Sequence, residues 1–350
     1  MNKKHKLAAV NSINWARILA QISYYFFAYV QLCEAGKIRF PEELRFVVPT
    51  GNFGDVLAGY FAKRMGLPIE KLVVATNAND ILHRFWETGK YVKKAAKGEE
   101  AEGGFKEDGA KAHESGVKET LSPAMDILVS SNFERLLWYL AYRVKKNEAA
   151  ENDVKALRIA AGKRVKGWQS ELKASGGFSV DQHILEAARE DFQSERVDDD
   201  ETVNMIRDAF RTYGGVSVIE GKEGRSEAAG TAPEGTKQKV GGYVLDPHSA
   251  IGIAASLRCI RRAAKGEENT ALQKPIEHVS LATAHPAKFS KAVELALSAE
   301  TGFRFEDVLP YEFKGLENLP RRMERLERPL ELGKVRDLMG RLMEEEKAAE

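Results

Sequence analysis

The sequence predicts an α/β protein built on an open, mostly parallel sheet flanked by helices. The strand candidate Leu44–Val48 is followed by a helical pattern over Phe53–Met65 and a second strand candidate over Lys71–Ala75. This order is typical of a βαβ unit, whose strands are buried on both faces. Apolar residues make up 43% of the 350 residues. That is enough for a large core, in about two domains or one large α/β unit.

The first element is a helix around the apolar run Ile18–Leu32. Lysines precede it, as they would in a signal peptide or a membrane anchor. However, Gln21 and Gln31 interrupt the run, and a spanning helix needs about 20 predominantly apolar residues. We therefore interpret it as a buried helix of a soluble protein, whose aromatic side chains need a partner to cover them.

The later elements follow from periodicity and turn residues. Helices are expected in the middle of the chain over Asn132–Val144, Ala156–Lys173, His183–Arg196 and Thr202–Tyr213. A strand candidate leads to Asp246, and Pro247 is well placed to begin a helix that runs to Ala264. The last strand is expected over His278–Ala282 and the last helix over Pro286–Leu297.

The charges nearly cancel, because 53 Lys and Arg against 52 Asp and Glu leave a net charge of +1. Nucleic acids and acidic membranes both attract a positive surface field, so we expect neither as the main partner. Two cysteines, Cys33 and Cys259, cannot form a disulfide framework or a zinc site by themselves. We expect a cytoplasmic protein without a metal site.

The turn Pro49–Asp55 lies between the first strand and its helix. Gly51 and Gly54 allow the backbone to approach a ligand closely, and the helix start presents unpaired amides at a positive dipole end. This arrangement suits a phosphate group. The turn is neither a Walker loop nor a dinucleotide fingerprint, since the Gly-Lys-Ser/Thr ending is absent and the glycine spacing differs. A capped strand–helix connection with Asp55 in its first turn explains the same residues equally well.

A second candidate position follows the last strand. Thr283 stands at the carboxyl end of that strand, and this end borders the ligand crevice in an open α/β sheet. Its hydroxyl can pair with a neutral ring nitrogen, or it can cap the helix that opens at Pro286. His285 has no visible partner in the sequence, and a lone histidine is more often structural than catalytic.

Five stretches in the expected order resemble one enzyme family. They are Ala9–Gln21, Pro49–Asp55, Ala75–Asp80, Leu121–Asp126 and Thr283–Phe289. Through them the sequence resembles threonine synthase, the pyridoxal-phosphate enzyme that converts O-phospho-L-homoserine and water to L-threonine and phosphate. The resemblance implies pyridoxal-phosphate fold type II, similar to the tryptophan synthase β subunit.

The resemblance also implies roles for single residues. The cofactor phosphate would lie on the loop of Gly51, Asn52, Phe53, Gly54 and Asp55, bound chiefly by backbone amides. Thr283 would face the pyridine nitrogen, and a hydroxyl partner leaves that nitrogen largely uncharged. The residues near the substrate would be Asn11, Ser12, Asn14 and Arg17. The guanidinium among them suits a phosphate or a carboxylate, whereas Asn11 and Ser12 are equally suited to cap the long helix. Four more matching residues have no assigned role: Asn79, Asp80, Ser122 and Asp126.

We expect the chain to be N-terminally incomplete. The family's Schiff-base lysine belongs to a Ser-Phe-Lys-Asp segment in an upstream region that this sequence does not contain. Lys106 lies in a polar stretch without a core around it, and Lys288 belongs to a matching stretch with another role. A catalytic lysine needs a desolvated, fixed setting, so neither is expected to replace it, and no catalytic residue is assigned.

With this resemblance, seven segments are expected along the chain. They are a cleft helix (1–40), βα units with the phosphate loop (41–92), a flexible insertion (93–118), a helical part (119–220), a flexible loop (221–241), βα units that close the cofactor site (242–329) and a charged C-terminal helix (330–350). Three hypotheses remain open. The chain is the body of an enzyme that needs the lysine-bearing segment, a non-catalytic fragment or pseudoenzyme that binds pyridoxal phosphate or a phosphorylated metabolite, or a poorly folded fragment.

Overall fold

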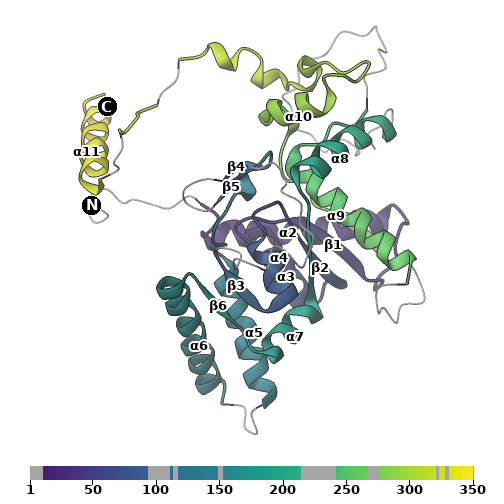
Figure 1. Cartoon of the computed structure of the whole chain (residues 1–350), viewed down its shortest axis with the longest axis vertical. Coiled ribbons are helices and arrows are strands. Elements are labelled where there is room, and N and C mark those ends of the chain that lie inside the picture. Colours follow the sequence, from purple (N-terminus) through teal and green to yellow (C-terminus); the bar gives the residue numbers. More distant parts are fainter. Residues whose placement is uncertain are drawn as a thin grey trace. The chain divides into compact units, whose positions relative to one another are not determined.

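The computed structural model describes residues 11–93, 111–112, 117–148, 153–213, 242–266, 276–320, 323–327 and 331–349 (Figure 1). They divide into two units, Met1–Val308 and Leu309–Glu350. The predicted 93–118 insertion falls mostly outside the described residues, and the 221–241 loop falls entirely outside them. The sheet, the main core and the candidate site all belong to the first unit.

The central sheet has four parallel strands in the order β7-β2-β1-β8. They are β1 (Leu44–Pro49), β2 (Ile69–Thr76), β7 (Phe192–Arg196) and β8 (Glu277–Ser280). Val47 of β1 pairs with Val73 of β2 on one side and with Ser280 of β8 on the other. The predicted parallel α/β sheet is therefore confirmed, and its strands all end at one edge.

The helices of the first unit are α2 (Trp15–Glu34), α3 (Gly54–Arg64), α4 (Ile81–Thr88), α5 (Phe133–Glu148), α6 (Val154–Ser175), α7 (Gln182–Asp191), α8 (Asp199–Thr212), α9 (Pro247–Ala264) and α10 (Ser290–Leu297). Short turns of 3-10 helix are η1 (Pro123–Met125), η2 (Pro286–Lys288) and η3 (Phe305–Val308). Two small antiparallel pairs join β3 (Lys90–Val92) to β6 (Gly177–Ser179) and β4 (Lys111–Ala112) to β5 (Lys118–Glu119). The second unit holds η4 (Tyr311–Phe313), η5 (Leu316–Asn318) and α11 (Leu332–Ala349), so the predicted helical tail is present.

Three predicted elements differ in the structure. The helix expected to reach Arg196 ends at Asp191, because Phe192 turns extended and begins a strand that pairs with β2. The strand expected before Asp246 is absent among the described residues 242–246, where Leu245 packs into the cluster beside α8 and α10. The last predicted helix is interrupted at Phe289, whose backbone leaves the helical region between η2 and α10.

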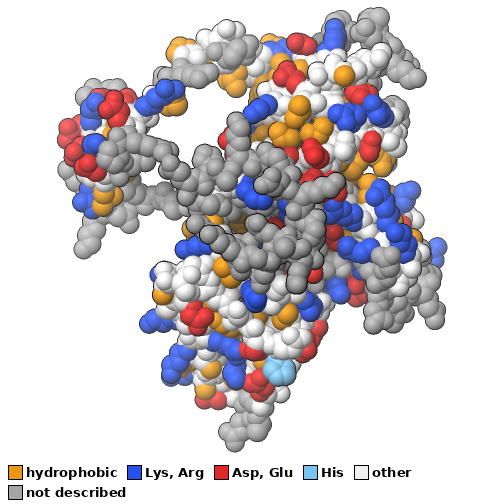
Figure 2. All heavy atoms as spheres, in the orientation of Figure 1, with side chains coloured by type: hydrophobic (Ala, Val, Ile, Leu, Met, Phe, Trp, Pro, Cys, Tyr) orange, Lys and Arg blue, Asp and Glu red, His pale blue; other side chains and the backbone are white. Residues whose placement is uncertain are grey.

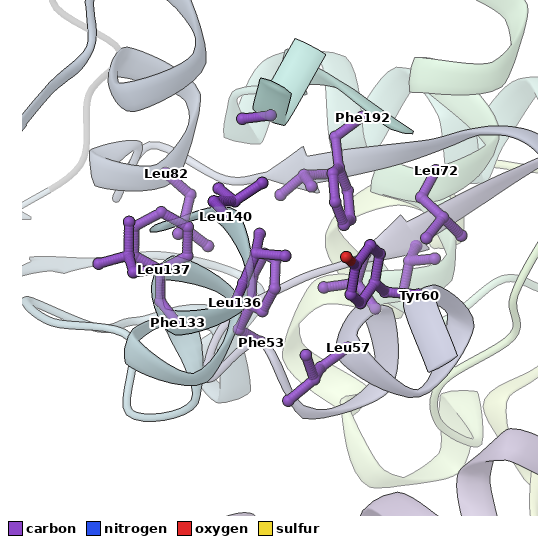
Figure 3. Packing of buried hydrophobic residues seen from close by; sticks show 14 of the residues in the cluster. Phe53, Leu57, Tyr60, Leu72, Leu82, Phe133, Leu136, Leu137, Leu140 and Phe192 are labelled. Carbon is purple, nitrogen blue, oxygen red and sulfur yellow. The ribbon is translucent and has the colours of Figure 1, made fainter. Parts of the chain in front are cut away.

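The main core lies between the sheet and helices α3, α4 and α5. The Phe53 ring stacks on Trp86 with a centroid distance of 6.0 Å and meets Phe133 edge-on at 5.3 Å. Figure 3 shows this ring among the leucines of α5, with Tyr60 and Phe192 beside it. A turn residue thus anchors the loop after β1 in the core.

Helix α2 is buried on one face only. Ile18, Ile22, Tyr25 and Tyr29 are buried against the rest of the unit. Another face carries an exposed apolar stripe of Trp15, Leu19, Phe27 and Val30, which are 49%, 58%, 67% and 48% exposed. The prediction of a buried helix is therefore confirmed for one face of α2 only. The expectation that a partner covers its aromatic side chains stays a prediction.

On the described part of the face in Figure 2, basic and acidic side chains are mixed along α5 and α6, and basic ones gather near the end of α9. No helix within the described ranges is long and apolar enough to cross a bilayer. Among the same residues, no group of three or more His, Cys, Asp or Glu side chains is arranged to hold a metal ion.

Candidate functional site

The loop between β1 and α3 exposes backbone amides at the start of a helix. Phe53, the residue before α3, has a left-handed backbone conformation, with φ 63°. Its side chain makes no hydrogen bond to the start of the helix. A non-glycine residue in this region carries backbone strain, and the buried Phe53 ring offsets it. The first-turn amides of α3 have no partner within the helix, so they are available to an anion.

Gly51 is held against the segment that contains η1. A Cβ atom at Gly51 would lie 2.8 Å from the Ala124 carbonyl oxygen and 3.1 Å from Met125 Cα. The Ser130 hydroxyl donates to the Gly51 carbonyl oxygen over 2.8 Å. Only glycine fits this approach without moving backbone. Gly54 has more room, since its nearest neighbours are 3.6 Å away.

Asn132 joins this loop to the segment before α2. Its side-chain Nδ2 donates to the carbonyl oxygens of Ser12 and Asn52, over 3.0 and 2.8 Å, and its backbone N–H also donates to Asn52. Arg135 donates to Asn132 Oδ1 and to the Ile13 carbonyl oxygen. Asn132 is fully buried, and its hydrogen bonds fix the two segments together.

Of the predicted substrate residues, Ser12 is therefore linked to the Gly51–Gly54 loop, and the others have different local roles. Asn14 caps α2 by accepting from the Ala16 amide over 2.9 Å, and Asn11 accepts from the Ile13 amide. The cap is thus Asn14 rather than Asn11 or Ser12. Arg17 is exposed on the first turn of α2. Asn52 Oδ1 accepts from the Ser131 hydroxyl over 3.2 Å, which orients the Asn52 amide.

Thr283 lies beyond the end of β8, next to the end of β1. The Leu281 amide continues the ladder by donating to Val47 over 3.0 Å, so Thr283 and Gly51 follow neighbouring parallel strands at the same edge. Thr283 is exposed, and its amide donates to Ser249 Oγ over 3.1 Å. The cap of η2 is His285, which accepts from the Ala287 amide. The alternative role of Thr283 as that cap is therefore wrong.

A polar cluster stands at the end of β2. Asp126 accepts from Thr120 Oγ1, Asn77 Nδ2 and Asn79 Nδ2 over 2.6, 2.8 and 2.9 Å. Asn77 also donates to Ser122 Oγ over 3.0 Å. Asn79, Ser122 and Asp126, to which the sequence assigned no role, thus fix the 120–126 segment against which Gly51 packs. Asp80 instead pairs with Arg84 and Arg196.

Asp55 is a carboxyl group in the first turn of α3. Burial raises its pKa to about 6, although a hydrogen bond from Tyr25 opposes the shift. The Tyr25 hydroxyl donates to the Asp55 carbonyl oxygen over 2.8 Å and lies 3.4 Å from Oδ1. The positive end of the helix favours the ionised carboxylate, but the loss of hydration outweighs this attraction.

Replacing Asp55 with asparagine should change the pH dependence of stability. The raised pKa means that the native state holds this proton when the unfolded state has released it. The contribution of Asp55 to stability therefore falls as pH rises from about 4 to about 6, by roughly 3 kcal/mol for this pKa difference. The free energy of unfolding of Asp55→Asn, measured in urea, should lack this decrease with pH. At pH 7 the variant should be more stable than the parent. Asp200→Asn, at an exposed first-turn position of α8, is the control and should keep the decrease. A difference in stability between parent and Asp55→Asn that stays constant from pH 4 to pH 6 would contradict the prediction.

Sequence reasoning missed several residues that build the site. Asn132 and Ser130 hold the loop. At the start of α9, His248 contacts Ala124, Ser249 contacts Thr283, and Asp246 binds both of these α9 side chains. The one visible signal was the run Asp246-Pro247-His248, which marked a helix start and nothing more. Lys288, one of two lysines considered as substitutes, is exposed in η2, and Lys106 lies outside the described residues.

Comparison with known proteins relates the chain to one enzyme family. The family model "Threonine synthase, C-terminal" matches residues 249–339. Threonine synthase of Schizosaccharomyces pombe is 44% identical over 319 residues, which are 90% of this chain and 51% of that protein. The chain is related to the threonine synthases. The crystal structure of the yeast threonine synthase matches 98% of this chain and 54% of its own, with 42% identity and a TM-score of 0.70.

The relationship to threonine synthase extends to the fold. A crystal structure of "PLP bound" threonine synthase from Brucella melitensis matches 96% of this chain with a TM-score of 0.64 and 34% identity. The chain therefore has the pyridoxal-phosphate fold type II that the sequence predicted. It spans about half the length of the curated threonine synthases that it matches.

Proposed function

We propose that the chain is the cofactor-phosphate-binding and substrate-binding part of a threonine synthase. The reaction is the conversion of O-phospho-L-homoserine and water to L-threonine and phosphate. The observation that carries the proposal is the meeting of three segments at one sheet edge: the Gly51–Gly54 loop, the residues before α2 and Thr283. Each belongs to a stretch that resembles threonine synthase, and the relatives bear that name. We expect this chemistry to take place in the cytoplasm.

The residues fit pyridoxal phosphate. Gly51 and Gly54 leave a backbone cradle, and a Cβ atom at Gly51 would displace the adjacent backbone. The amides at the start of α3 would hold the phosphate, with help from the Asn52 side chain. Thr283 would meet the ring nitrogen through its hydroxyl. When bound, the cofactor supplies an electron sink for carbanions beside the amino group of the substrate.

The residues before α2 would orient the substrate. Asn11, Ser12 and Asn14 bring polar groups to the phosphate loop, since Asn132 binds the Ser12 carbonyl oxygen. Arg17 stands one turn into α2 and is exposed, so its guanidinium is free to meet a phosphate or carboxylate group, for which its fork of donors is suited. Their common task is to bind the anionic substrate and keep its reacting carbons over the cofactor ring.

Proton transfer in this chemistry needs a lysine. Lys288, the described lysine that was considered as a substitute, is exposed and lacks the desolvated, fixed setting that a catalytic lysine needs. The proposal therefore assigns this lysine to the region of the threonine synthases that the chain does not match. That region would also provide cover for the exposed stripe of α2.

Two measurements test the proposed function. Equilibrium dialysis of the 350-residue chain against pyridoxal phosphate should detect saturable binding. A fusion to the part of S. pombe threonine synthase that this chain does not match should release phosphate from O-phospho-L-homoserine and form threonine. Binding without phosphate release from the fusion would favour a non-catalytic binding protein, and absence of binding by both proteins would sink the proposal.

A further inference from the structure

Three buried side chains at the start of α9 form a hub between the two sides of the candidate site. Asp246, His248 and Ser249 are 1%, 3% and 5% exposed. Asp246 Oδ1 lies 2.9 Å from His248 Nδ1 and also accepts from the His248 amide over 2.9 Å. Asp246 Oδ2 accepts from the Ser249 hydroxyl. One carboxylate therefore orients both neighbours.

One arm of the hub reaches the segment that closes on the phosphate loop. The Ala124 amide donates to His248 Nε2 over 3.2 Å, and the carbonyl oxygen of the same residue is the atom that a Cβ at Gly51 would meet. The His248 ring also packs edge-on against Phe289 with a centroid distance of 4.6 Å. This arm therefore contacts the η1 backbone that packs on Gly51.

The other arm reaches the position proposed to face the cofactor ring. The Thr283 amide donates to Ser249 Oγ over 3.1 Å, while the Ser249 hydroxyl proton goes to Asp246. Helix α9 itself sits tightly on both strands, because a Cβ at Gly252 would lie 3.0 Å from Pro49 Cγ and would also meet Ser280 Oγ. The hub is therefore seated on the ends of β1 and β8.

The donors fix the direction of every hydrogen bond in the hub. A backbone amide can only donate, so His248 Nε2 must accept, and the ring proton lies on Nδ1 and is given to Asp246. Asp246 accepts at both oxygens, as an ionised carboxylate does. Burial raises the pKa of this carboxyl, but hydrogen bonds from His248 and Ser249 outweigh it and hold the pKa below its ordinary value.

We propose that Asp246, His248 and Ser249 are positioning residues that set the phosphate loop and Thr283 in register with each other for one ligand. The His248 arm acts on the phosphate end, and the Ser249 arm acts on the ring end. The inference rests on the proposed function, because it takes pyridoxal phosphate as the ligand that spans both ends.

Affinity measurements with two probes test the assignment. Ser249→Ala should weaken pyridoxal phosphate binding roughly threefold to tenfold, the range for one lost hydrogen bond, and leave inorganic phosphate binding unchanged. His248→Leu should weaken the binding of both probes. The matched control is Ser256→Ala, on the same helix, because Ser256 is 6% exposed and its hydroxyl has no hydrogen-bond partner among the described residues. It should leave both affinities as they are.

Several outcomes would overturn the assignment. Equal losses for both probes in Ser249→Ala, or no loss in either variant, would refute the hub while leaving the proposed function intact. A parent chain that binds neither probe would refute both. Should the variants not fold, amide hydrogen exchange of the parent decides. Ala124 and Thr283 are exposed residues, yet their amides should exchange slowly, and fast exchange at either would exclude the hub.

Discussion

Gly51→Ala should lose pyridoxal phosphate binding by 10-fold to 100-fold. The new methyl group would lie 2.8 Å from the Ala124 carbonyl oxygen, and that atom belongs to backbone that Asn77, Ser122 and Asp126 hold in place. Crowding of this kind costs about 1–3 kcal/mol of stability. If the loop moves to relieve the crowding, a similar free energy is lost from ligand binding, which gives the expected loss of affinity. Equilibrium dialysis and urea unfolding of parent and variant measure the two effects.

Two other glycines serve as controls for this prediction. Gly167 in α6 has open space around its Cβ position, so Gly167→Ala should preserve binding and raise stability slightly through helix propensity. A Cβ atom at Gly54 would meet its nearest neighbours only at 3.6 Å. The affinity of Gly54→Ala for pyridoxal phosphate should therefore lie between those of Gly51→Ala and Gly167→Ala. If Gly51→Ala binds pyridoxal phosphate as tightly as Gly167→Ala, the close approach at Gly51 has no part in ligand binding.

The sequence was informative about the sheet because its signals are local. The β1 strand, the turn with Gly51 and Gly54 and the α3 helix are each encoded by neighbouring residues, and all three were predicted. The 192–196 strand was mistaken for helix, since its strand character comes from pairing with β2, whose residues lie more than 110 positions earlier. Strand pairing over such a distance leaves no periodic signal in the strand itself.

Contacts between residues far apart in the sequence also account for the parts of the site that could not be predicted. The turn and Thr283 could be proposed, because strand ends mark ligand crevices in parallel sheets. Asn132 and His248 could not, since the hydrogen bonds that tie each of them to the site reach residues 80 and 124 positions away. Their importance comes from burial and from hydrogen bonds to backbone, which a sequence without a structure does not reveal.

Phe27→Glu should prevent the chain from associating with the part of threonine synthase that carries the Schiff-base lysine. Phe27 is the most exposed member of the α2 stripe, at 67%, and Leu19 is 58% exposed on the same helix. Burying a large apolar side chain contributes about 1.5–3 kcal/mol, and a carboxylate buried in its place adds a desolvation cost. The expected loss is therefore at least roughly 100-fold in affinity. The partner to use is the part of S. pombe threonine synthase that the chain does not match, expressed separately and titrated by calorimetry.

The control for Phe27→Glu is Ile159→Glu on α6. Ile159 is 51% exposed, so the same charge is introduced at a similarly open apolar position away from α2. Ile159→Glu should bind the partner as the parent does and release phosphate from O-phospho-L-homoserine when the two are mixed. Phe27→Glu should neither bind the partner nor release phosphate. Equal binding by the two variants would mean that the stripe is not the contact surface. Self-association of the parent that disappears in Phe27→Glu would instead identify a second copy of the chain as its occupant.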